Sequence, residues 1–267
     1  MEIFSYQFML NALIGIFISS VLCGIVGSLI VVNRIVSLAG SIAHAAYGGV
    51  GIAFYFGLPV QLITMLFSSI SGLIIAKISE NSSHRSDSYI GILWASGMAL
   101  GIILIDLTPG YNADIMTYLF GNILTITSED LIISFLILLI TLFVIIIFYN
   151  RILILSFDKE YAMVMGYNVR LLNYVIYVLI SVSIVILIRM TGIIMIMAML
   201  TIPQNIAIKR SKSLFSMMVI SSILVIFFSL LGFFFAYKFD LSTGATIIIF
   251  SALIYLLDSV YLYAKKR

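Results

Sequence analysis

His44 is the residue with the clearest chemical potential, because it stands in the middle of an apolar run and the chain has only two histidines. In the segment LAGSIAHAAYGGVG, Gly40, Tyr47 and Gly48 share its helical face. A neutral imidazole is a common transition-metal ligand and can also relay protons. The segment therefore predicts either a metal or proton site in the wall of a pathway, or a histidine hydrogen-bonded across a close helix contact.

Small residues surround His44, and they bear on both interpretations. Gly40, Gly48 and Gly49 leave almost no side-chain bulk, which predicts close packing against another helix. One histidine cannot complete a metal site, which needs about four ligands. No glycine-rich phosphate loop, nucleophile elbow or pair of carboxylates at helical spacing occurs elsewhere, so we expect a protein that is not an enzyme.

The composition requires a membrane around these residues. The 267-residue chain is 63% hydrophobic and 9% charged, against roughly 45–50% and about 25% in soluble domains. A spanning helix takes about 20 apolar residues, and long strand alternation is absent from the sequence. The prediction is an all-α polytopic membrane protein with about nine spans, eight to ten being possible. The apolar runs are 8–32, 38–56, 60–78, 89–107, 131–149, 171–188, 192–208, 214–237 and 246–263.

The basic residues predict the orientation of these spans in a prokaryotic cell membrane. With the N-terminus outside and the C-terminus inside, all of the 14 lysines and arginines except Arg189 and Lys238 fall on the cytoplasmic side. We interpret 111–127, which contains Asp114 and Asn122, as an extracytoplasmic interfacial or re-entrant helix rather than a tenth span. The net charge of +3 is too small and scattered to indicate nucleic acid as a partner.

The cytoplasmic loop after the fifth run, SFDKEYAMVMGYNVR, predicts a short amphipathic helix. Ser156 can cap its start, Asp158 and Glu160 favour its first turn, and Gly166 is a stop signal. Such a helix can lie in lipid headgroups or bind a protein, and its acidic flanks favour a protein over an anionic membrane. Its apolar face consists of Phe157, Tyr161, Val164 and Met165.

Six stretches of the chain carry a family pattern. They are VLCGIVGSLIVVNRIVSLAGSIAHAAYGGVGIAFYFG, YIGILWASGMALG, TYLFGNILTITSEDL, LSFDKEYAMVMGYNVRLLNYVIYVLI, TGIIMIMAMLTIPQNIA and FDLSTGATIII. Taken together and in this order, they resemble the membrane permease subunits of ABC transporters that import zinc, manganese or iron. The resemblance implies one permease domain over 1–267 with the ABC importer permease fold. It also implies a homodimer or a dimer with a close paralogue, two cytoplasmic ATPase subunits that hold the ATP, an extracytoplasmic metal-binding protein, and a divalent metal as cargo.

The resemblance also implies residue roles. The family's intramembrane metal motif is an Asp followed four residues later by a His, and here Gly40 stands at the Asp position before His44. In a dimer, two His44 side chains can supply a pair of ligands, with Ser41 or Tyr47 adding oxygens. The segment near 156–168 corresponds to the coupling helix that docks on the ATPase, through Phe157, Asp158, Glu160, Tyr161, Met165 and Gly166.

These features favour the permease subunit of an ATP-driven importer of zinc, manganese or iron. A permease for a metal chelate, of the siderophore or cobalamin type, is the alternative within this class, because a bulky chelate needs a path lined by small residues. A channel or proton-coupled secondary carrier is the alternative from another class. It needs several intramembrane acids or bases, and the spans offer few besides His44.

Overall fold

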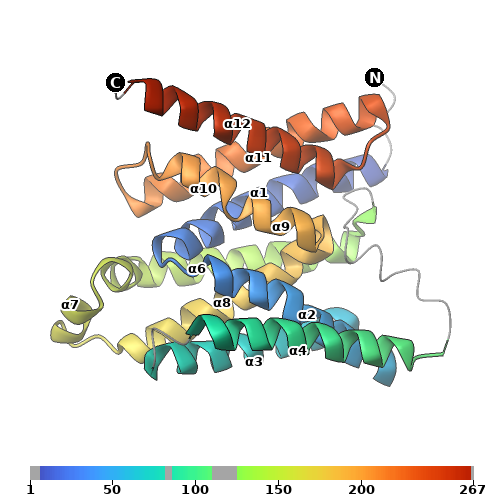
Figure 1. Ribbon diagram of the computed structural model, residues 1–267, viewed down its shortest axis with the longest axis horizontal. Coiled ribbons are helices and arrows are strands. Elements are labelled where there is room, and N and C mark those ends of the chain that lie inside the picture. The colour runs from blue at the N-terminus through green and yellow to red at the C-terminus, as the bar shows by residue number, and fades with distance from the viewer. Residues whose placement is uncertain (1–6, 82–85, 110–124, 266–267) are drawn as a thin grey trace. The chain divides into compact units, whose positions relative to one another are not determined.

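The computed structural model describes residues 7–81, 86–109 and 125–265, and over these ranges it is helical without strands (Figure 1). This confirms the predicted all-α class. The long helices are α1 (Gln7–Val32), α2 (Val36–Phe56), α3 (Val60–Asn81), α4 (Ser86–Asp106), α6 (Ser128–Phe157), α8 (Val169–Thr191), α11 (Leu214–Phe239) and α12 (Thr243–Lys265). The short helices are α7 (Lys159–Val164), α9 (Ile193–Met199) and α10 (Ile202–Ala207).

The eight long helices are each long and apolar enough to cross a membrane, and they match eight of the nine predicted runs. The remaining run, 192–208, is divided into α9 and α10. The chain turns at Thr201, and Pro203 lies in the first turn of α10, where its missing N–H costs no helical hydrogen bond. Most of 111–127 lies outside the described residues, so the re-entrant interpretation stays a prediction.

The contacts divide the chain into two compact units. One comprises Met1–Val31, Met116–Leu138 and Arg189–Arg267, and the other comprises Val32–Ile115 and Leu139–Ile188. The first holds nearly all of α1 together with α9 to α12, and the second holds α2, α3, α4 and α7. The single permease domain over 1–267 stays a prediction.

In the first unit, α9 and α10 follow one another along α11 and α12 (Figure 1). Arg189, just before α9, forms an ion pair with Asp130 near the start of α6. Lys209 and Arg210, just after α10, form ion pairs with Asp258 near the end of α12. The two short helices together therefore take the place of the predicted seventh span.

A buried glutamine fastens this broken helix to α1. The side-chain amide of Gln204 donates to the backbone oxygen of Cys23 at 2.9 Å and to that of Met199 at 3.1 Å. An ideal Cβ on Gly27 would lie 2.3 Å from the Gln204 amide nitrogen. Glycine at this position makes room for a polar side chain that satisfies carbonyl oxygens away from water.

In the second unit, glycines bring α2 and α4 into backbone contact. A Cβ on Gly97 would lie 2.8 Å from the Cα of Ala45, and one on Gly101 would lie 2.4 Å from the backbone oxygen of Tyr47. The hydroxyl of Ser41 adds a hydrogen bond of 2.8 Å to the backbone oxygen of Ile90. Close approach through small residues is how helices associate where lipid replaces water.

We predict that Gly101→Ala destabilises the protein, because its Cβ meets backbone that no rotamer change can move aside. Overpacking of this kind costs about 1–3 kcal/mol. Gly91→Ala is the matched control on the same helix, since nothing lies within 4 Å of its Cβ and alanine favours a helix. Thermal unfolding in detergent measures both variants, and equal melting temperatures would contradict the close α2–α4 contact.

Candidate functional site

His44 lies on α2 with its imidazole stacked on the indole of Trp94 from α4. The ring centroids are 4.3 Å apart and the planes differ by 13°. His44 is half-buried, so the indole covers one face of the imidazole while part of the side chain remains exposed. A histidine binds a metal ion through a nitrogen lone pair that lies in the ring plane. The stack with Trp94 covers a face of the imidazole and leaves the edge that carries the nitrogens uncovered by the indole.

Ser41 and Tyr47, the residues expected to supply oxygen ligands beside His44, take part in helix packing. Ser41 is fully buried and donates its hydroxyl proton to the Ile90 carbonyl, while Tyr47 is buried where α2 meets Gly101. Gly48 and Gly49 lie at close contacts too, because a Cβ there would meet Gly97 and Thr64 at 2.9 and 2.7 Å. Gly40 is buried in the same helix.

No group of three or more His, Cys, Asp or Glu side chains in the described part of the chain is arranged to hold a metal ion. His44 therefore has no protein carboxylate or thiolate completing a site beside it within these ranges. The contribution of a second copy of the chain, with its own His44, stays a prediction.

The expected cytoplasmic helix is α7, but it begins two residues later than the sequence indicated. Asp158, not Ser156, is its cap, and the Asp158 carboxylate accepts a hydrogen bond of 2.9 Å from the Tyr161 backbone N–H. Ser156 still belongs to α6, and its hydroxyl oxygen accepts a hydrogen bond of 3.1 Å from the Asn33 side-chain amide. Because α6 continues to Phe157 with Leu155 buried, the cap falls at Asp158, and an aspartate caps a helix as well as a serine does.

Gly166 ends this segment with a φ of 77°, a left-handed conformation that glycine adopts without steric cost. The apolar side chains around α7 point outward. Val164 is 84% and Phe157 72% exposed, whereas Ala162 is fully buried and faces the rest of its unit. Tyr161, Met163 and Met165 are also exposed, as is Glu160.

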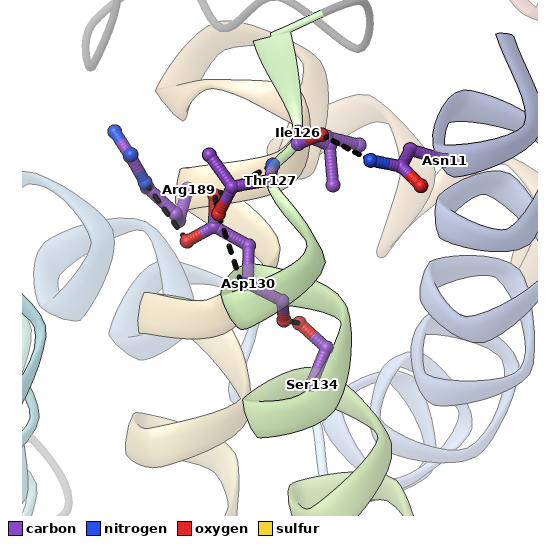
Figure 2. A network of polar contacts seen from close by, with 6 residues as sticks. All are labelled: Asn11, Ile126, Thr127, Asp130, Ser134 and Arg189. Atoms are coloured by element: carbon purple, nitrogen blue, oxygen red, sulfur yellow. Dashed lines mark hydrogen bonds and ion pairs between the residues drawn. The ribbon is translucent and has the colours of Figure 1, made fainter. Parts of the chain in front are cut away.

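A polar network near the start of α6 was not predicted from the sequence (Figure 2). Thr127 and Asp130 form a reciprocal cap, in which the Asp130 carboxylate accepts from the Thr127 backbone N–H at 3.1 Å and the Thr127 hydroxyl accepts from the Asp130 N–H at 3.2 Å. The Arg189 Nε donates to the other Asp130 oxygen at 3.2 Å. The residues TSED, with a hydroxyl three positions before an acid, are the signal that could have revealed this capping box.

Two further hydrogen bonds extend the network. The Asn11 side-chain amide of α1 donates to the Ile126 carbonyl at 3.2 Å, and the Ser134 hydroxyl donates to the Asp130 carbonyl at 2.6 Å (Figure 2). Asp130 is buried although it carries a charge, which is tolerated because each carboxylate oxygen has a donor. Hence the start of α6 is held to both α1 and the end of α8.

Within the described residues, eight long apolar helices, a broken ninth and an exposed amphipathic helix in a loop are the features of a multi-pass membrane protein. The chain belongs to the ABC 3 transport family, which it matches over residues 5–262. The resemblance inferred from its sequence motifs and its predicted multi-pass membrane location are thereby confirmed.

Individual relatives match over nearly their whole length. An uncharacterized membrane protein of Synechocystis is 37% identical, with 96% of this chain and 91% of the relative covered. The manganese import system permease protein ScaB of Streptococcus gordonii is 36% identical, with 98% and 94% covered. In the solved structure of PsaBC from Streptococcus pneumoniae with a Fab, one chain superposes with a TM-score of 0.86 at 33% identity, covering 96% of this chain and 92% of that one.

We predict that Asp130→Ala lowers the stability of the protein by about 1–3 kcal/mol, because it removes a helix cap and an ion pair together. Arg189→Ala should cost less, since the Arg189 side chain is 40% exposed and the cap survives its loss. Glu129→Ala removes an exposed neighbouring acid and serves as the control. Thermal unfolding ranks the three, and a larger effect from Glu129 than from Asp130 would show the network to be unimportant.

Proposed function

We propose that this chain is the permease subunit of an ATP-driven importer of a divalent transition metal, with manganese as the favoured cargo and zinc and iron as less supported ones. The observation that carries the proposal is the match, over nearly both full lengths, to a manganese import permease. The composition of the site agrees, because a half-buried imidazole inside an apolar bundle is suited to a transition-metal cation.

ATP hydrolysis in this proposal belongs to a separate ATPase subunit that docks on α7. Five apolar side chains around α7 are exposed, Phe157 and Val164 most of all. Apolar surface gathered in this way is unfavourable in water and is typical of an interaction site. Asp158 and Glu160 beside them disfavour an anionic lipid surface. The Asp158 cap and Gly166 mark the two ends of α7, and in this proposal the short helix moves as one unit when the ATPase closes.

The transport cycle is alternating access between two conformations. An extracytoplasmic binding protein delivers the metal, and two permease copies, identical or closely related, enclose the pathway. ATP binding closes the ATPase pair, and α7 carries this closure to the spans. Coupling requires that the ATPase, the binding protein and the metal each bind the two states with different affinity.

We assign His44 as the ligand from this chain that contacts the metal. Ser41 and Tyr47 are the oxygen donors closest to it in sequence, but their packing roles mean that they reach an ion only after α2 and α4 separate. The other ligands are then the second His44, backbone oxygens or water. Gly40, in place of a carboxylate, lowers the negative charge around the ion.

We expect Val164→Asp to weaken association with the ATPase by about tenfold or more, because an unpaired carboxylate in an apolar interface costs more than about 1.4 kcal/mol. Leu241→Asp is the control, since Leu241 is 57% exposed in the loop between α11 and α12. Co-purification of the tagged permease with its ATPase measures the effect. Retention of the ATPase by the Val164 variant, or metal uptake in liposomes lacking any ATPase, would refute the proposal.

We expect His44→Ala to reduce manganese uptake into metal-depleted cells by about tenfold or more, since losing even an outer partner of a metal ligand has effects of that size. His84→Ala replaces the other histidine of the chain and is the control. Uptake of radioactive manganese at matched expression is the measurement. Unchanged uptake in His44→Ala would exclude His44 from the pathway.

A further inference from the structure

Trp94 is the single tryptophan of the chain, and its position beside His44 is set by backbone packing. Gly97, three residues further along α4, abuts Ala45, the residue that follows His44 on α2. This contact holds the two helices so close that the indole and imidazole rings stack at 4.3 Å. The pair is thus a product of close backbone contact between α2 and α4.

The stack is the one ring contact or hydrogen bond that the described residues offer to the imidazole of His44. Histidines that bind metals are normally oriented by a hydrogen bond from their second nitrogen to a carboxylate, a carbonyl or water. Here Gly40 supplies no carboxylate one turn earlier on the same face. The indole of Trp94 is the described side chain that is in place to fix the ring plane.

The geometry of the stack leaves ligation possible. With the planes only 13° apart, the indole covers a face of the imidazole, while the nitrogen lone pairs point outward in the ring plane. A divalent cation bound to one nitrogen withdraws electron density and makes the imidazole more positive. The negative face of an indole attracts such a ring, as it attracts other cations within about 6 Å.

We propose that Trp94 is a positioning residue for His44, which fixes the ring plane and stabilises the metal-bound imidazole from its face. This inference rests on the proposed function, because it assumes that His44 binds the transported cation. Burial alone does not explain Trp94, since 42% of its surface is exposed, the same fraction as that of Tyr89 on the same helix. Tyr89 therefore provides a matched control with an aromatic ring on α4 but no stacked histidine.

Fluorescence of the purified, metal-free permease tests the stack without any transport. Because Trp94 is the only tryptophan, its emission reports this site alone. We expect His44→Ala to change the intensity of the emission, since it removes the ring stacked on the indole, and Tyr89→Leu to leave the emission unchanged. Identical emission from the wild-type and His44→Ala proteins would show that the rings do not stack and would overturn the proposal.

Uptake of manganese by the complete transporter tests the positioning role. We expect Trp94→Leu to raise the half-saturating manganese concentration by roughly three- to tenfold with little change in maximal rate, and Trp94→Phe, which keeps an aromatic face, to stay within about twofold of wild type. Tyr89→Leu should match wild type. If Trp94→Leu behaves like Tyr89→Leu, or if Trp94→Phe is as impaired as Trp94→Leu, the inference fails.

The two proposals fail in different ways. Uptake that depends on His44 but not on Trp94 rejects the positioning role and leaves the importer intact. Uptake that is absent from the wild-type transporter with every divalent metal offered rejects the importer itself, whatever the fluorescence shows. A lowered maximal rate in Trp94→Leu with an unchanged half-saturating concentration assigns Trp94 to helix packing and overturns the inference.

Discussion

The hydrocarbon core of a membrane offers no water to polar groups, so each buried donor and acceptor must find its partner within the protein. Three polar side chains of the described spans meet this constraint with two or more contacts each. Gln204 donates hydrogen bonds to carbonyl oxygens of α1 and α9. The Asp130 carboxylate accepts hydrogen bonds from the Thr127 backbone N–H and from Arg189. Asp258 pairs with Lys209 and Arg210, which follow α10. These contacts hold a broken helix in place without a continuous helical hydrogen-bond ladder.

The same absence of water removes the usual force that drives helices together, so packing takes over. In the α2–α4 pair, glycine lets backbone touch backbone, and the stack of His44 on Trp94 is a consequence of that approach. The ring is thereby packed against an aromatic face. In the inference proposed above, Trp94 of α4 orients the ring, and Gly40 contributes no carboxylate.

In the second unit, α7 presents the opposite situation, in which apolar rather than polar side chains lack a covering partner within the described residues. There α7 exposes apolar side chains that a membrane span would hide in lipid, and its cap and terminal glycine give it fixed ends. In the importer we propose, an ATPase subunit covers this apolar surface, and this contact links ATP binding in another chain to movement of the spans.

The sequence by itself determined the membrane class, the number of apolar runs and the presence of α7, because these depend on composition and on local periodicity. The family followed from the resemblance of six stretches of the chain taken together and in order. The sequence also singled out His44, a polar residue in an apolar run. Its prediction of Ser156 as the cap of α7 was wrong, because the cap is Asp158 and its position depends on how far α6 extends. Only tertiary structure brought Trp94 to His44, 50 residues away, and Arg189 to Asp130, because such pairings follow from helix packing, for which a single sequence carries no periodic signal.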